Sequence, residues 1–244
     1  MLSKDGSKIC FYDGLGFDHQ LWLLNPAGGP PKVLTSIPDT GFRGVAWSPD
    51  GTALYVAVGN TSTTVYKVSA LDNPTGPTIT ALGTTTLTNL HTPWGSIPTI
   101  DVYPTGNPIL VNVDRGASQL IEFWQDGTVR PINTDVVLSE LACCPLPGDP
   151  RIAVEINGGT TPQLAVSTYH PVPPSVGMST WGTSAPLGSS AYWLESPRWS
   201  PGGLYLTCQH WTGTVKQLVL FGSDGLTTKV LNLDGSCDAS DWAP

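Results

Sequence analysis

The stretch VAWSPDGTALYVAVG, residues 45–59, places a tight turn between two apolar runs. Proline presets the backbone for a turn, and Asp-Gly is a preferred turn dipeptide because glycine tolerates positive φ angles. The flanking residues are mostly Val, Ala, Leu and Tyr, which suit buried β-strands. The stretch therefore predicts two antiparallel strands joined by a short turn.

Related stretches recur along the chain. Each has a proline, here called the anchor proline, that follows a short apolar segment, and four of the five copies also continue into a glycine-containing turn. The anchor prolines are Pro49, Pro104, Pro145, Pro201 and Pro244, separated by 41 to 56 residues. Two further β-rich runs and their turns follow each of the first four anchors. A repeat of about 40 to 45 residues with four strands is typical of a β-propeller blade.

The two ends of the chain divide one more copy of the repeat between them. The N-terminal KDGSKICFYDG continues a turn of the WSPDG kind, and the C-terminal SDWAP, residues 240–244, begins one. Joining both ends in one blade would remove two unpaired sheet edges. The sequence thus predicts an all-β fold: a single propeller domain over residues 1–244, with five four-stranded blades. The C-terminal strand, residues 241–243, would close the ring in the blade that contains residues 4–35. Six blades remain an alternative, because the two longest spacings could each hold irregular strands.

These repeats resemble TolB-type propeller repeats, which are relatives of the WD40 class. Residues 4–35 and 42–70 match the pattern well, and the copies with Val102 and Cys143 in place of tryptophan match it less well. The resemblance covers the whole chain and implies a propeller fold. It implies no particular activity, because propellers carry many unrelated functions.

Composition excludes several classes of function. Charged residues make up only 12%, with 11 Lys and Arg against 19 Asp and Glu, so the net charge is −8 and clustered positive charge for nucleic acid is lacking. No apolar run is long enough to span a membrane, and the N-terminus lacks the apolar core of a secretory signal. We therefore expect no nucleic-acid partner, no membrane insertion, and a location in the cytoplasm or in a virus particle.

Cysteine and histidine show no metal-binding spacing. The five cysteines form no CxxC pair and the four histidines are scattered, so we expect buried thiols and neither a metal ion nor another cofactor.

Tryptophan marks both the expected core and the expected binding face. Trp47, Trp199 and Trp242 share one repeat position, which predicts that they pack between blades. Other aromatic and polar residues fall in the loops that enter blades or join second and third strands. Loops on a rigid scaffold are where binding residues concentrate. The predicted binding residues, on one face of the disc, are Trp94, Trp181, Trp193, Trp211, His210, Arg115 and Tyr192. The alternative is that long loops fold back and bury their own aromatics.

Three classes of function fit this pattern. The first is a non-enzymatic scaffold that binds a protein partner through the loop-rich face, as a subunit of an assembly such as a virus particle or its tail. The second is a carbohydrate-binding propeller, although the loops differ from blade to blade. The third is a five-bladed glycoside hydrolase with central carboxylates such as Asp101, Glu140 and Asp241. No catalytic signature accompanies those carboxylates, so we place the scaffold first and do not expect an enzyme.

Overall fold

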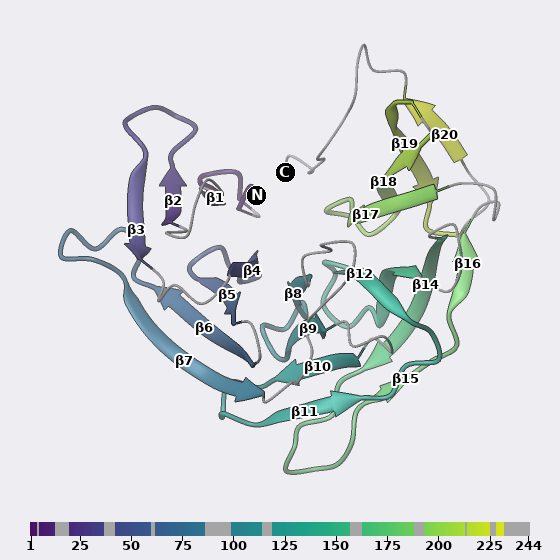
Figure 1. Cartoon of the computed structure of the whole chain (residues 1–244), viewed down its shortest axis with the longest axis horizontal. Helices are drawn as coiled ribbons and strands as arrows, with labels where there is room; N and C mark the ends of the chain where they lie inside the picture. The colour runs from purple at the N-terminus through teal and green to yellow at the C-terminus, as the bar shows by residue number, and fades with distance from the viewer. Residues whose placement is uncertain are drawn as a thin grey trace.

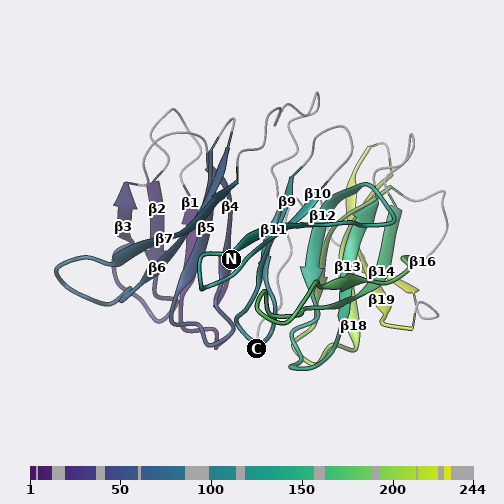
Figure 2. The same ribbon diagram turned by 90° about the horizontal axis from the view of Figure 1, so that it is seen from below.

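The computed structural model describes residues 1–3, 5–12, 20–36, 42–59, 62–85, 99–113, 119–156, 163–187, 193–212, 214–224 and 228–231. These residues form β-strands and turns, with no helix among them. The described residues accordingly include no helix that could cross a membrane. Figure 1 shows the strands as sheets arranged around a central axis, and Figure 2 shows the same sheets from the side.

Five antiparallel sheets follow one another along the chain, which confirms the predicted five-bladed β-propeller. Blade one holds β1 (Ile9–Tyr12), β2 (Gln20–Leu24) and β3 (Lys32–Ser36). Blade two holds β4 (Phe42–Trp47), β5 (Leu54–Val58), β6 (Thr63–Ser69) and β7 (Thr78–Thr85). Blade three holds β8 (Ile100–Val102), β9 (Ile109–Val113), β10 (Gln119–Phe123) and β11 (Val129–Ile132). Blade four holds β12 (Leu138–Cys143), β13 (Arg151–Ile156), β14 (Gln163–His170), β15 (Thr180–Trp181) and β16 (Ala185–Leu187). Blade five holds β17 (Trp193–Trp199), β18 (Tyr205–Trp211), β19 (Lys216–Gly222) and β20 (Thr228–Leu231).

Within each blade, consecutive strands pair with one another as a meander. In blades two to five the first strand lies nearest the axis (Figure 1). In blade four, β15 and β16 both pair with β14 and together take the place of the fourth strand. Blade one has three described strands plus the bridge between Leu2 and Ile9. The predicted closing strand, residues 241–243, lies outside the described residues.

The turn after the first strand is built the same way in four blades. In blade two, Ser48 N donates to Ala53 O at 2.8 Å, and Gly51 N donates to Ser48 O at 2.9 Å. Gly51 has a φ of 69°, a left-handed conformation that favours glycine. The equivalent glycines Gly6, Gly106 and Gly203 also have positive φ and donate to the matching carbonyl. The repeated turn residues in the sequence therefore correspond to hydrogen bonds that recur in the turn after the first strand.

Hydrophobic side chains pack between neighbouring blades rather than in one central core. Four clusters join blades one and two, two and three, three and four, and four and five. The anchor tryptophans Trp47 and Trp199 are buried, at 8% and 7% exposure, and belong to two of these clusters. Their predicted role in blade packing is confirmed, while Trp242 lies outside the described residues.

One loop prediction was wrong. The sequence of residues 173–196 has many turn-forming residues and predicts a loop, yet residues 180–181 and 185–187 are strands β15 and β16, and residues 193–196 begin strand β17. The backbone groups of β15 and β16 pair with β14, which would otherwise be an unpaired sheet edge. Pairing along β14 therefore prevails over the weak local β preference of this segment.

Candidate functional site

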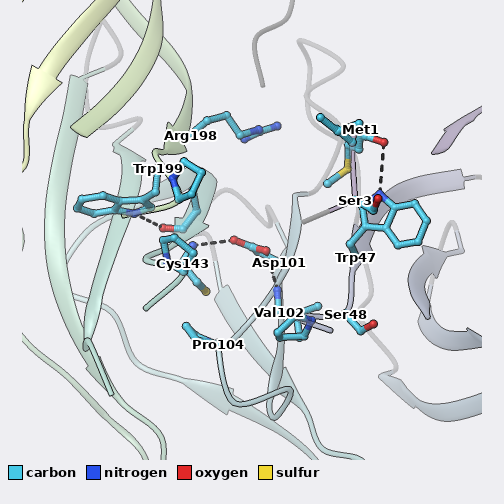
Figure 3. A pocket seen from close by; sticks show the side chains of 15 residues that line it. Met1, Ser3, Trp47, Ser48, Asp101, Val102, Pro104, Cys143, Arg198 and Trp199 are labelled. Carbon is cyan, nitrogen blue, oxygen red and sulfur yellow. Dashed lines mark hydrogen bonds between the residues drawn. The ribbon is translucent and has the colours of Figure 1, made fainter. Parts of the chain in front are cut away.

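A cavity of about 190 Å³ lies on the axis of the ring (Figure 3). Its walls come from the first strands of blades two to five and from the first residues of the chain. Because it is lined by Ser48 and by the anchor prolines Pro49, Pro104, Pro145 and Pro201, it lies where strand one turns into strand two. We call this side the turn end, and the opposite side, where strand two meets strand three, the loop end. The remaining lining residues are Met1, Leu2, Ser3, Trp47, Asp101, Val102, Ala142, Cys143, Arg198 and Trp199.

Asp101 and Arg198 share one repeat position, three residues before the anchor proline, and both line this cavity. The carboxylate of Asp101 accepts hydrogen bonds from the backbone N–H groups of Val102, at 2.7 Å, and Cys143, at 2.6 Å. Burial raises the pKa of Asp101, opposed by these two hydrogen bonds and by the charge of Arg198. Asp101 thus joins the first strands of blades three and four and faces the only basic residue among those that line the cavity.

Asp101 and Cys143 are in contact, and the Cys143 thiol is unreactive. Burial and the neighbouring carboxylate raise the pKa of the Cys143 thiol well above its usual range. A buried thiol that stays protonated is a poor nucleophile, so Cys143 fills space rather than reacting. Cys10, Cys144 and Cys208 are also free and buried, as the sequence predicted for the thiols.

The two anchor tryptophans connect neighbouring blades through the same hydrogen bond. Trp199 Nε1 donates to Ala142 O at 2.9 Å, and Trp47 Nε1 donates to Met1 O at 3.3 Å (Figure 3). In both cases the acceptor belongs to the first strand of the preceding blade. The Trp199 ring also lies 4.9 Å from the guanidinium of Arg151, a cation–π contact. The cavity wall is therefore held in place by hydrogen bonds as well as by packing.

Glu140, the second candidate carboxylate for catalysis, lies on β12. Its Oε1 accepts from Ser196 Oγ at 3.4 Å, and its Oε2 is buried without a hydrogen bond. Glu140 lies directly opposite Glu155 in the sheet register, so both side chains lie on the same face. Asp241, the third candidate carboxylate, lies outside the described residues.

A second charged network was not predicted from the sequence. The carboxylate of Glu122, fully buried, accepts from Arg130 Nε, Tyr169 Oη and Trp124 Nε1. Arg130 donates in turn to the carbonyls of Val172 and Gly177 and to Ser179 Oγ. The network therefore fixes the segment between β14 and β15 of blade four against blade three. Glu122 and Arg130 lie opposite one another on β10 and β11. A correct prediction of this strand register would have identified the ion pair.

The residues predicted to form the binding face are only partly placed. Trp94, Arg115 and Tyr192 lie outside the described residues, and of Trp193 only the backbone is described. Trp193 pairs with Trp211 at the loop end of blade five, where Thr212 N donates to Val215 O between β18 and β19. Trp211 is exposed and His210 is half-buried.

Trp181 does not lie where the sequence predicted. Trp181 belongs to β15, where it pairs with Tyr169 close to the turn end. The sequence had placed it in a loop at the loop end. Its ring packs against Tyr169, with ring centroids 6.4 Å apart, and its Nε1 donates to Asp135 Oδ1 at 2.9 Å. Trp181 is partly buried against the cluster between blades three and four, so pairing with β14 decides its position.

Within the described parts of the chain, no three His, Cys, Asp or Glu side chains come close enough together to hold a metal ion.

Solved structures resemble this fold over almost the whole chain. TolB from Acinetobacter baumannii superposes with a TM-score of 0.69 at 18% identity, over 96% of this chain and 54% of that one. A chain of the nidogen/laminin complex gives a TM-score of 0.60 at 13% identity, over 94% of this chain and 79% of that one. A putative 6-phosphogluconolactonase from Bacteroides uniformis gives 0.58 at 15% identity, over 94% and 68%.

These likenesses establish a TolB-like propeller fold and nothing finer. The chain spans about half the length of the TolB chain that it matches. No protein-family model and no curated protein sequence matches it. These solved structures include a chain of a protein complex and a putative enzyme, so function has to be argued from this chain's own residues.

Proposed function

We propose that this protein is a non-enzymatic scaffold that binds a protein partner at the loop end of the propeller. The observation that carries the proposal is Trp211, a large aromatic side chain exposed at the end of β18 on a rigid sheet. Tryptophan is among the residues most often responsible for binding energy at protein interfaces. Trp193, Tyr192, His210, Trp94 and Arg115 are the further residues that we assign to this surface.

The chemistry on the axis favours a scaffold over a hydrolase. A retaining or inverting glycosidase needs two carboxyl groups that both face the substrate. Asp101 instead uses both of its oxygens to bind backbone N–H groups of β8 and β12. We infer a structural role for this carboxylate, and chromogenic glycosides tested with wild type, Asp101→Asn and Glu140→Gln check the hydrolase alternative. Turnover that either variant abolishes would favour that alternative.

We further propose that the partner is another subunit of a larger assembly, such as a virus particle or its tail. Low charge and many β-strands with short turns suit a rigid part of such an assembly, and TolB-like propellers supply a rigid frame for it. A glycan is the alternative ligand, because exposed indole rings can also stack on sugars. A glycan array probed with wild type and Trp211→Ala separates the two ligands, since only a glycan ligand gives a signal that depends on Trp211.

A photo-crosslinking residue at position 211 tests the protein partner directly in cells that produce the chain. The matched control carries the same photo-crosslinker at position 204, because Leu204 is an apolar residue exposed at 63% on the turn end of the same blade. We expect one defined protein adduct from position 211 and none from position 204. Adducts from position 204 alone would place the interface on the turn end and contradict the proposal.

A further inference from the structure

The outer strands of four blades carry features that discourage the addition of a further strand. Among these outer strands, β3 contains Lys32, β11 contains Pro131 and β20 contains Lys229. In blade four, β15 and β16 have only two and three residues, and β16 includes a proline. Charged residues, prolines and short lengths are the means by which natural sheets protect their edges from pairing with other chains.

The outer strand of blade two, β7, has none of these protective features. It is eight residues long, with the sequence TITALGTT, and it contains neither a charged residue nor a proline. Figure 1 shows this strand along the outer rim of the ring. Among the described residues, β7 pairs with β6, and no turn or other strand makes a backbone hydrogen bond to its second edge. This edge of the propeller is therefore open.

The N-terminal half of β7 is the exposed part of the strand. Blade three packs against the other half: Leu82 is buried in the cluster between blades two and three, and a Cβ atom added to Gly83 would lie 2.5 Å from Val129 Cγ2. The strand also bulges at Leu82, where its register with β6 shifts. Residues 78–81 all have exposed side chains, and that of Ile79 is 42% exposed. The available edge is thus the four-residue stretch TITA.

We propose that residues 78–81 pair with the same residues of a second copy of this chain, as antiparallel strands related by a two-fold axis. The sheets of the two copies of blade two then form one continuous sheet. The stretch suits its own copy because it has no charge, so self-pairing places no like charges opposite one another. With the axis beside Ile79, the two Ile79 side chains face one another and each Thr78 faces a Thr80. Cross-strand threonine pairs and β-branched residues both favour a sheet.

The symmetry and size of this contact determine how the association behaves. Pairing about a two-fold axis uses the same edge on both copies, so the association stops at two chains. Four residues from each copy bury less than the standard interface of about 1,600 Å², so the dimer is weak and depends on protein concentration. Each chain has a net charge of −8, so two copies repel one another at long range. Salt screens this repulsion and therefore strengthens the dimer.

Sedimentation velocity over a range of protein and salt concentrations tests the dimer. Wild type should shift from monomer to dimer as either concentration rises. Ile79→Lys places a charge on the open edge, as β3 and β20 do naturally, and should weaken dimerisation about tenfold or more. Val230→Lys is the matched control, because Val230 is also β-branched, is 44% exposed and lies on the outer strand β20. This control should dimerise like wild type, and both variants should keep the wild-type melting temperature.

Single cysteines test the strand register independently of affinity. In a Cys237→Ser background the other native thiols are buried in the structure. Ile79→Cys should then form a disulfide between two chains, because residues directly opposite one another in a sheet lie within disulfide reach. Val230→Cys should stay reduced. A mixture of Thr78→Cys chains and Thr80→Cys chains should form mixed disulfides in preference to disulfides between like chains, as antiparallel pairing requires.

Each of these measurements can overturn the proposal. A wild type that stays monomeric at every protein and salt concentration would do so, and so would an Ile79→Cys variant that stays reduced. Dimerisation that persists unchanged in Ile79→Lys would place the contact on another surface. Disulfides that join like chains in the Thr78→Cys and Thr80→Cys mixture would rule out the two-fold pairing. Trp211→Ala should leave the dimer intact, so the result is independent of the partner proposed for the loop end.

Discussion

The indole of Trp199 donates its hydrogen bond to the carbonyl of Ala142 across the boundary between blades four and five, at 2.9 Å. The same ring stacks under Arg151, whose guanidinium also donates to Gly203 O at 3.0 Å. One side chain thus links the first strand of its own blade to two strands of the preceding blade. Trp47 makes the equivalent bond to Met1 O at 3.3 Å, so two blade boundaries are joined by an anchor tryptophan in the described structure.

Trp199→Phe should destabilise the fold through the loss of this hydrogen bond. Phenylalanine keeps much of the buried area but leaves Ala142 O without its donor, which costs about 1 to 3 kcal/mol. Trp199→Ala also creates a cavity and should cost about 3 to 5 kcal/mol. Urea unfolding of the three proteins measures both steps, and a Trp199→Phe variant as stable as wild type would show that the bond contributes nothing.

Asp101→Asn should change the pH dependence of stability. Because burial raises the pKa of Asp101 in the folded state, the protonated form contributes stability at low pH. That contribution is lost as the pH rises from 3.8, the usual pKa of an aspartate, through the higher pKa of the folded state. The stability of wild type minus that of Asp101→Asn should therefore fall between pH 3.8 and neutral pH.

Thermal unfolding of both proteins across that range provides the measurement. Taking the difference removes the contributions of Asp5 and Asp149, whose pKa values are lowered by hydrogen bonds and which act in the opposite direction. A difference that rises with pH would mean that the hydrogen bonds from Val102 and Cys143, and not burial, dominate at Asp101.

Glu140→Gln should stabilise the protein. Glu140 and Glu155 are directly opposite on adjacent strands, and like charges in that position repel one another by about 0.2 to 1 kcal/mol. Glu155→Gln is the informative comparison, because it also weakens the hydrogen bond that Ser139 Oγ donates to Glu155 Oε1 at 2.6 Å and should gain less. Equal melting temperatures for wild type and Glu140→Gln would show that the two carboxylates do not repel.

Sequence repeats predicted the fold because the turn after the first strand is built in the same way in four blades and from similar residues in most of them. Ser48, Asp50 and Gly51 each make a local hydrogen bond or backbone conformation that only a few residue types allow, so the pattern survives in the sequence. Asp101 and Arg198 could be placed at the axis for the same reason, since they share a repeat position. Counting repeat positions thus located the first strands and two residues of the cavity.

Long-range contacts are what the repeat could not reveal. Trp181 was predicted in a loop because its neighbours favour turns, yet residues 180–181 and 185–187 pair as strands with the edge of β14. The Glu122–Arg130 pair depends on strand register and on the path of residues 171–179, neither of which is local in sequence. The axial cavity at the turn end was also missed, because short polar turns give no sign of the space that they surround.

Affinity for the partner identified by crosslinking tests the central claim most directly. The binding constant of that protein should be measured for wild type, Trp211→Ala and the turn-end control Leu204→Ala, together with their melting temperatures. If Trp211 carries the interface at the loop end, its loss should weaken binding about 30- to 1,000-fold, equivalent to about 2 to 4 kcal/mol, and leave the melting temperature nearly unchanged. Leu204→Ala should affect neither property. Undiminished affinity of Trp211→Ala, or a fall in its melting temperature as large as that of Trp199→Ala, would contradict the account.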